Sequence, residues 1–185
     1  MLFWRLSHTL VEFSKAGITL AALFIFLIFS VVVLPGQSAA AAAYSGSSGS
    51  PDLSLFYSSK DLYQMAELYG STGRDAYVRA RFSFDLVFPI IYTLFLATAI
   101  SWVLGTITPE TSSWRMLNLA PILGMLFDFL ENITASIVIS RYPALSPISA
   151  NLAPVFTFSK WVFVGGSFLI LFISGLASLF ARKKN

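Results

Sequence analysis

Residues 116–140, MLNLAPILGMLFDFLENITASIVIS, decide the fold of this chain. A helix across a membrane requires roughly 20 apolar residues, because the hydrocarbon core is about 30 Å thick. This stretch is long and apolar enough, but it carries Asp128 and Glu131 near its middle, with Asn132 beside them. A carboxylate at the bilayer centre costs at least about 2.5 kcal/mol. We therefore expect these side chains to face other helices or water.

The three polar residues share one face of the predicted helix. Side chains three and four positions apart are neighbours on a helix surface, so Asp128, Glu131 and Asn132 form a single polar patch. Gly124 lies one turn earlier on this face, where its missing side chain permits close approach of another backbone. The other helices are expected to shelter this patch from lipid.

The composition is that of an integral membrane protein. The chain has 185 residues, of which 56% are hydrophobic and 11% are charged, and its mean hydropathy is +0.75. Soluble domains carry about 25% charged residues. Three further apolar runs contain no charged residue, namely Ala16–Leu34, Leu86–Ile107 and Trp161–Ala181. We predict an all-α fold with four transmembrane helices in a bundle, a short outer amphipathic helix and a proline-rich outer loop.

Charge and cysteine content exclude several classes of function. The net charge is only +3, and the basic residues form no clustered face of the kind that binds nucleic acid. The sequence has no cysteine, which rules out disulfides, thiol nucleophiles and thiolate metal sites. The expected partners are the lipid bilayer, a lipid ligand and other subunits of a membrane complex.

The chain divides into five segments. They are an N-terminal tail with the first span (1–34), a flexible Ala/Ser/Gly linker (35–57), an amphipathic outer helix (58–70), a three-span bundle (71–181) and a basic tail (182–185). The bundle contains the proline-rich loop at 141–155, which has three prolines and cannot be a regular helix throughout.

The first apolar run has two interpretations. Alanines at 39–43 follow it and resemble the cleavage region of a signal peptide. However, the run from Ala16 to Leu34 is longer than the roughly 7–15 apolar residues of a signal peptide, which favours an uncleaved anchor. Both interpretations remain open at this point.

The outer helix is predicted from its ends and its apolar stripe. Ser58 and Asp61 have the spacing of a capping box, and Gly70 is a natural stop. The apolar stripe consists of Leu62, Met65 and Tyr69. Such a helix is expected to lie on the membrane surface or on the bundle.

The distribution of basic residues predicts the orientation in the membrane. Equal numbers lie on the two sides, but one set is concentrated in the tails and one tight loop. This set contains Arg5, Lys15, Arg115, Arg182, Lys183 and Lys184. The positive-inside rule then places both termini of this multi-pass protein in the cytoplasm.

This topology brings polar residues from three spans together in one outward-opening pocket. The candidate ligand-binding residues are Arg81, Asp85, Tyr92, Asp128, Glu131, Asn132, Thr157 and Lys160. Arg141 and Tyr142 are expected at the same pocket. Arg81 and Asp85 are four residues apart and are expected to form an ion pair.

The chemistry of this pocket has three interpretations. Lys160 or Arg81 could neutralise the carboxylates in a purely structural network. The pocket could bind a lipid, another small ligand or a divalent cation, for which Asp85, Asp128 and Glu131 would supply the oxygen ligands. The acidic residues could also catalyse a reaction on a lipid, although the common hydrolase and phosphate-binding motifs are missing from the sequence. Ligand binding is the favoured function, and enzymatic activity stays open.

Four short motifs carry a resemblance to a known group of proteins. They are Asp85-x-x-Phe88-Pro89-x-x-Tyr92, Asp128-x-x-Glu131-Asn132, Arg141-Tyr142-Pro143 and Thr157-x-x-Lys160-Trp161. Together they resemble a group of uncharacterised four-helix integral membrane proteins. The resemblance covers residue 71 to the end of the fourth span and implies the fold but no activity.

Overall fold

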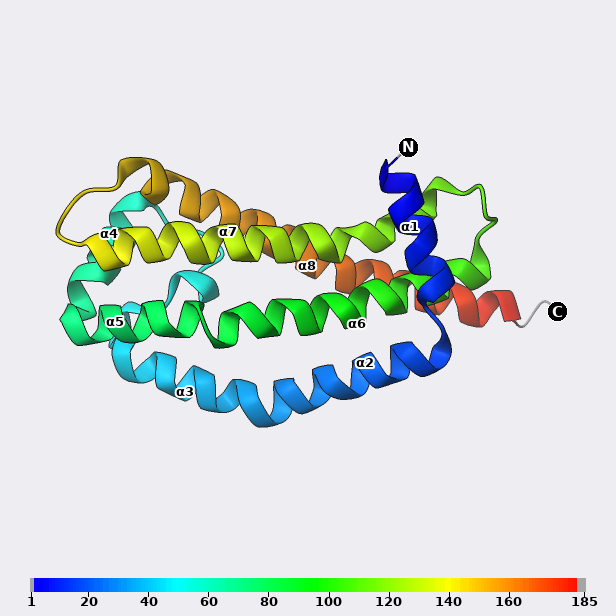
Figure 1. Cartoon of the computed structure of the whole chain (residues 1–185), viewed down its shortest axis with the longest axis horizontal. Coiled ribbons are helices and arrows are strands. Elements are labelled where there is room, and N and C mark those ends of the chain that lie inside the picture. Colours follow the sequence, from blue (N-terminus) through cyan, green and yellow to red (C-terminus); the bar gives the residue numbers. More distant parts are fainter. Residues whose placement is uncertain (1, 183–185) are drawn as a thin grey trace. The chain divides into compact units, whose positions relative to one another are not determined.

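The computed structural model describes residues 2–182, and these residues are folded almost entirely into helices (Figure 1). In chain order the elements are α1 (Leu2–Phe13), α2 (Ala16–Ile28), the π-helical turn η1 (Phe29–Val33), α3 (Leu34–Ser45), the 3-10 helices η2 (Gly46–Ser48) and η3 (Pro51–Leu53), α4 (Ser59–Leu68), α5 (Gly70–Arg81), α6 (Phe84–Ile107), the 3-10 helix η4 (Ser113–Leu119), α7 (Ala120–Arg141) and α8 (Pro147–Arg182). The predicted all-α fold is confirmed. The expected basic tail at 182–185 lies outside the described residues except for the backbone of Arg182.

Four helical stretches of the described chain are long and apolar enough to cross a membrane. They are Ala16–Ser45, Gly70–Ile107, Ser113–Arg141 and Pro147–Phe180. The first and last keep many apolar side chains exposed, such as Phe24 at 65% and Phe172 at 64%. Apolar side chains exposed along a whole helix are typical of contact with lipid. The prediction of four spans is confirmed.

Contacts divide the described residues into two compact units. The first unit contains residues 2–27, 90–125 and 162–182, and the second contains 28–89 and 126–161. With the exception of Tyr92, all predicted site residues belong to the second unit.

The first unit is held together by a buried amide and a close helix approach. Asn118 is fully buried, and its Nδ2 donates to the Ser7 carbonyl at 3.0 Å and to the Ser101 hydroxyl at 2.9 Å. A Cβ atom added to Gly124 would meet Cγ2 of Val164 at 2.8 Å. Glycine is therefore required where α7 approaches α8, as the sequence predicts.

The segment expected to be a flexible linker, 35–57, is ordered in the second unit. Its first part forms α3, because the alanines at 39–43 are the strongest helix formers. The chain then turns at Gly46 (φ +54°) and Gly49 (φ +69°), a left-handed region that favours glycine. Tyr44 packs edge-on against Tyr69 and Tyr77, which fixes α3 beside α5. This ordered path replaces the linker that composition led us to expect.

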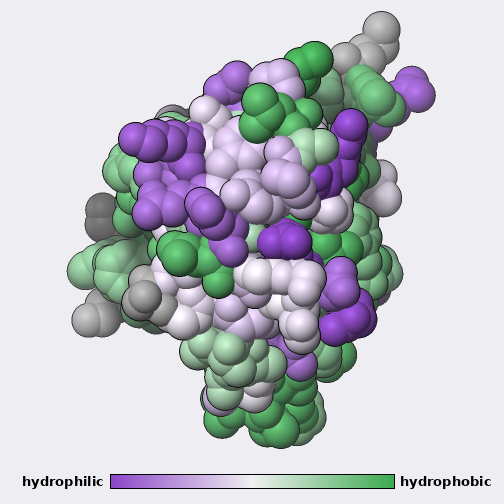
Figure 2. Space-filling view, turned by 90° about the vertical axis from the view of Figure 1, so that its left-hand side faces the viewer, coloured by the Kyte–Doolittle hydropathy of each residue, from purple (hydrophilic) through white to green (hydrophobic). Residues whose placement is uncertain are grey.

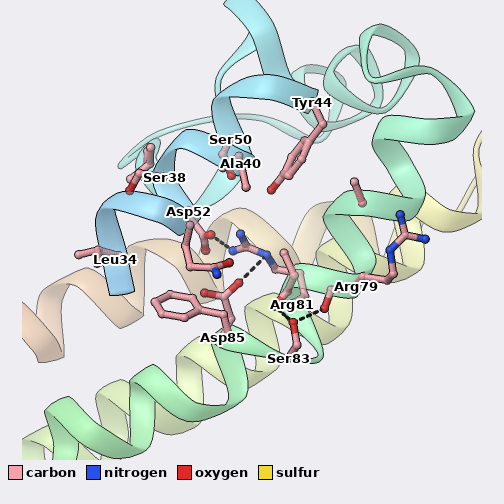
Figure 3. A pocket seen from close by; sticks show the side chains of 16 residues that line it. Leu34, Ser38, Ala40, Tyr44, Ser50, Asp52, Arg79, Arg81, Ser83 and Asp85 are labelled. Carbon is pink, nitrogen blue, oxygen red and sulfur yellow. Dashed lines mark hydrogen bonds and ion pairs between the residues drawn. The ribbon is translucent and has the colours of Figure 1, made fainter. Parts of the chain in front are cut away.

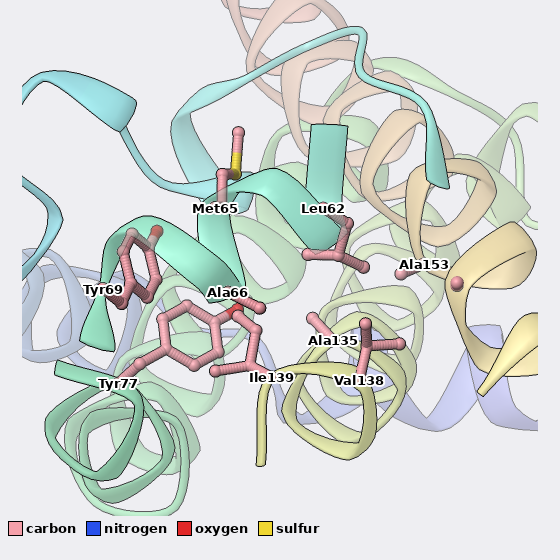
Figure 4. Packing of buried hydrophobic residues seen from close by; sticks show 10 residues of the cluster. Leu62, Met65, Ala66, Tyr69, Tyr77, Ala135, Val138, Ile139 and Ala153 are labelled. Atoms are coloured by element: carbon pink, nitrogen blue, oxygen red, sulfur yellow. The ribbon is translucent and has the colours of Figure 1, made fainter. Parts of the chain in front are cut away.

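The predicted outer helix is present as α4, and its capping box forms as expected. Ser58 and Asp61 exchange side-chain and backbone hydrogen bonds at its start. Its apolar stripe is buried in a cluster with α5, α7 and α8 (Figure 4). The cluster consists of Leu62, Met65, Ala66, Tyr69, Tyr77, Ala135, Val138, Ile139, Ala150 and Ala153. The helix is therefore docked on protein through this stripe.

The proline-rich loop is shorter than the sequence predicts. Only residues 142–146 are non-helical, because α8 already begins at Pro147. Proline suits the first position of a helix, where its missing N–H has no intrahelical partner. Pro154 lies inside α8, which continues past it. The expectation of an extended loop over 141–155 is corrected accordingly.

Hydrophilic residues gather on the face of the second unit that carries α4 and α5 (Figure 2). Exposed charged residues of this unit include Lys60, Glu67, Asp75, Arg79 and Arg141. Since exposed charges are costly in hydrocarbon, we expect this face to meet water or lipid headgroups.

Candidate functional site

Five charged side chains of the second unit form a row of alternating sign, which we call the ion chain. Its order is Asp85, Arg81, Asp52, Lys160, Glu131. Arg81 Nε lies 3.0 Å from Asp85 Oδ2, and its guanidinium also pairs with Asp52 (Figure 3). Lys160 Nζ lies 3.2 Å from Asp52 Oδ1 and 2.5 Å from Glu131 Oε2. Each cation thus lies between two carboxylates, and Asp52 joins the two halves.

Separate elements supply the members of the ion chain. Arg81 ends α5 and Asp85 lies in the first turn of α6, so the expected i,i+4 pair is confirmed. Glu131 comes from α7, Lys160 from α8 and Asp52 from η3. The ion chain therefore ties distant segments of the sequence together.

Burial differs along the ion chain. Glu131 is 0% exposed and the Lys160 side chain is 7% exposed. The side chains of Asp52 and Asp85 are 20% and 17% exposed. Buried charges are tolerated only with partners, and the Glu131–Lys160 pair meets this requirement. The ion chain consequently has a buried end at Glu131 and a more open end at Asp85 and Asp52.

A proline explains how Asn132 joins this network. Pro89 has no N–H, so the carbonyl of Asp85, four residues earlier, has no intrahelical donor from that position. Asn132 Nδ2 donates to this carbonyl at 3.3 Å and to Asp128 Oδ1 at 3.2 Å. Asp128 is 9% exposed. The polar patch of α7 is therefore anchored to the start of α6.

Tyr57 and Thr157 lie near the buried end. Thr157 Oγ1 donates its only hydrogen to the Ala153 carbonyl at 3.0 Å. The Tyr57 hydroxyl, 2.9 Å from Thr157 Oγ1, is therefore the donor in the hydrogen bond between them. Burial raises the pKa of Tyr57 above its ordinary value, which keeps the phenol protonated. The Trp161 indole Nε1 donates to the backbone carbonyl of Asp52 at 3.1 Å and so holds η3 on α8.

A cavity of about 340 Å³ adjoins the open end of the ion chain (Figure 3). Its walls come from α3, the turn with η3, α5 and the start of α6. It is lined by Leu34, Gln37, Ser38, Ala40, Ala41, Tyr44, Ser50, Asp52, Leu53, Ala76, Arg79, Ala80, Arg81, Ser83, Phe84 and Asp85. Tyr44 and Ser50 contribute hydroxyls to this wall, where the Tyr44 phenol interacts with Arg81 and the Ser50 hydroxyl with Tyr69.

The structure gathers most, but not all, of the residues that the sequence analysis assigned to one pocket. Those that meet in the charged and polar network are Arg81, Asp85, Asp128, Glu131, Asn132, Thr157 and Lys160. Only Arg81 and Asp85 of the predicted set line the cavity. Tyr92 is buried in the first unit, and Arg141 is exposed at the end of α7. Ligand binding by these residues stays a prediction.

Each of the predicted metal ligands Asp85, Asp128 and Glu131 has a protein partner. Within residues 2–182, no three Asp, Glu, His or Cys side chains lie close enough together to hold an ion. Asp85 and Glu131 each pair with a cationic side chain, and Asp128 accepts from Asn132. These partners take the places that a divalent cation would need.

Sequence reasoning missed Asp52, the central residue of the ion chain. It lies in the segment that composition assigned to a linker, and its neighbours in sequence do not indicate which residue it pairs with. Its isolation was the one available sign of a role, since Asp52 is the only charged residue between Lys15 and Lys60. Tyr44 and Ser50 were missed for the same reason.

No protein family, curated protein or solved structure matches this chain. Its function is therefore inferred from its own residues.

Proposed function

We propose that this multi-pass membrane protein binds a lipid or another small ligand in the cavity beside the ion chain. The observation that carries the proposal is the cavity itself, whose wall contains the carboxylates of Asp52 and Asp85 and the hydroxyls of Tyr44 and Ser50. Its volume of about 340 Å³ falls within the range of roughly 300–1,000 Å³ that is usual for small-molecule sites.

The setting of the cavity favours binding over a purely structural role. The buried end of the ion chain is closed by the ion pair between Lys160 and Glu131. At the open end, the partly exposed carboxylates of Asp52 and Asp85 border the cavity together with Tyr44 and Ser50. A ligand with polar groups would meet these side chains.

Filling the cavity provides the test. Ala41 lines the cavity, whereas Ala42 is exposed and does not. The full chain should be purified in mild detergent and analysed by native mass spectrometry as wild type, Ala41→Trp and Ala42→Trp. We expect bound lipid or small molecule in the wild type and Ala42→Trp, and its loss in Ala41→Trp. Identical spectra for all three proteins would support the structural alternative instead.

We also propose that both termini lie in the cytoplasm, as the density of basic residues indicates. The chain has no native cysteine, so single cysteines can be labelled cleanly. A cysteine at Leu145, which is 73% exposed, should react with an impermeant reagent from outside the cell. A cysteine at Ser113 should react only after the membrane is opened. The reverse pattern would overturn this orientation.

The first span is proposed to remain attached as an anchor. Cleavage near Ala43 would remove Leu34, Gln37 and Ser38, and with them one wall of the cavity. The intact mass of the membrane-extracted protein distinguishes the two cases, because cleavage would shorten the chain by about 40 residues.

A further inference from the structure

We infer that α1 is an interfacial helix, which lies in the headgroup layer of the bilayer with one apolar face among the acyl chains. The partner of this face is the phospholipid surface. The face belongs to the first unit and is independent of the proposed ligand cavity. Three features of α1 support this position: its direction, the division of its surface into three faces, and its connection to a membrane span.

The first feature is the direction of α1. In Figure 1 it runs across the direction of α2 and α6, which are parts of two membrane spans. It packs on η4 and near the end of α6, where a Cβ atom added to Gly105 would meet Cγ1 of Val11 at 3.0 Å. A helix that crosses the ends of the spans lies along the membrane surface, as interfacial helices do.

The second feature begins with the face that α1 turns toward the protein. Ser7 and Ser14 are both buried, and Val11 lies between them in the sequence. These three residues are three and four positions apart, so they share one side of the helix. On this side the Asn118 amide donates to the Ser7 carbonyl at 3.0 Å. The protein face therefore uses small and slender side chains and leaves the bulkier apolar ones for another face.

The apolar face consists of Leu2, Phe3, Leu6 and Phe13. All four side chains are exposed, Leu2 at 74% and Phe3 at 63%. With 3.6 residues per turn, they gather in one sector of the helix, beside the protein face. In water this sector would expose several large apolar side chains next to one another. Such an exposed apolar patch marks contact with another protein or with a membrane.

The polar face consists of Arg5, His8, Thr9 and Glu12. The same periodicity places these residues in a separate sector, between the apolar face and the other edge of the protein face. His8 Nδ1 lies 3.4 Å from Glu12 Oε1 on this face. The helix thus has protein on one side, an apolar face on the second and a polar face on the third. This division matches a position between acyl chains and water.

The third feature is the connection to the first span, which favours lipid over another protein as the partner. Only Ser14 and Lys15 separate α1 from α2. In α2 the apolar side chains of Leu20 and Phe24 are exposed, within a stretch that is long and apolar enough to cross a membrane. Lys15 is exposed directly before this span, where a charged side chain reaches the interface. The apolar face of α1 therefore lies at the depth where lipid begins to cover the chain.

Spin labels provide the test, because the sequence has no native cysteine. The full chain, with a single label at Leu6→Cys, Phe13→Cys, Arg5→Cys or Thr9→Cys, is reconstituted in phosphatidylcholine vesicles. Collisions with oxygen, which concentrates in acyl chains, and with a water-soluble nickel chelate are then measured. We expect labels at Leu6 and Phe13 to lie roughly 5–10 Å into the boundary of headgroups and acyl chains. Labels at Arg5 and Thr9 should collide with nickel several-fold more often.

A matched pair of substitutions tests what holds α1 at this depth. Leu6→Asp adds a charge to the apolar face and Thr9→Asp adds one to the polar face, and both positions are exposed. With the label at Phe13, Leu6→Asp should lower oxygen collisions and raise nickel collisions several-fold, because hydrocarbon disfavours the charge. Thr9→Asp should leave both rates unchanged.

Three results would overturn the inference. Frequent nickel collisions at Leu6 and Phe13 would show that the apolar face meets water. Few collisions with either reagent at these positions would show that protein covers the face, as in a dimer of this chain. Equal effects of Leu6→Asp and Thr9→Asp would show that the apolar face does not set the depth of α1.

Discussion

The two ends of the ion chain contain the same chemistry but differ in their surroundings. At the buried end, Glu131 is 0% exposed and Lys160 lies 2.5 Å from it. At the open end, Asp85 and Asp52 flank Arg81, are about one-fifth exposed and border the cavity. The buried end has one cation, Lys160, for one carboxylate, Glu131. The open end has one cation, Arg81, for the two carboxylates of Asp52 and Asp85.

This difference separates stability from binding. Removing one member of a fully buried pair leaves a charge without solvent or partner, which is strongly destabilising. Removing one carboxylate from the open end leaves Arg81 with the other one. We therefore expect substitutions at the buried end to affect folding, and those at the open end to affect ligand binding.

The largest effect is expected for Lys160→Met. This change leaves the buried Glu131 without its cation and should cost about 3–5 kcal/mol in the free energy of unfolding. Glu131→Gln should cost less, because Lys160 keeps Asp52 at 3.2 Å. The double variant should recover part of the loss. Denaturant unfolding in detergent measures all three, and strictly additive losses would show that the two residues are not energetically coupled.

The next effect concerns the apolar cluster that docks α4. Leu62 is 0% exposed, so Leu62→Ala should destabilise by about 2–5 kcal/mol and speed hydrogen exchange in α4. Leu68 lies on the same helix at 61% exposure, so Leu68→Ala is the matched control and should change stability by less than about 0.5 kcal/mol. Equal effects of the two substitutions would contradict docking of α4 through its apolar stripe.

A smaller effect on stability is expected for Asp52→Asn. Arg81 keeps Asp85 and Lys160 keeps Glu131, so each cation still has a carboxylate. The loss should be about 1.5–3 kcal/mol, the scale of a hydrogen bond to a charged group. Retained ligand would then be measured by native mass spectrometry, and we expect it to fall. A loss as large as that of Lys160→Met would remove the distinction between the two ends.

The smallest effect is expected at an exposed carboxylate outside the ion chain. The backbone N–H of Ser58 donates to Asp61 Oδ2 at 2.8 Å and lowers the pKa of this carboxyl. Its stabilisation is therefore fully present above the unfolded pKa of about 4 and is lost as the pH falls through the lower folded pKa. Hydrogen exchange in α4 should speed up over this acidic range. Asp61→Asn should remove that pH dependence, and an unchanged profile would argue against the cap.

Local patterns in the sequence determined the helices and several of their contacts. Hydropathy predicts the four spans, because lipid demands long apolar helices. The Ser58–Asp61 cap and the Arg81–Asp85 pair follow from spacings of three and four residues. In each case the interacting groups are neighbours in sequence, so their chemistry can be read without knowing the rest of the fold.

Only the tertiary structure decided which side chains form the site. Asp52 and Lys160 are separated by 108 positions, and no periodicity connects them. The alanine-rich segment becomes a cavity wall because α3 packs on α5, although its composition alone resembles a linker. The Asp85 carbonyl meets Asn132 because Pro89 leaves it free and α7 lies within reach. Long-range pairs depend on how segments pack in space, and a single sequence encodes that packing only through the whole fold.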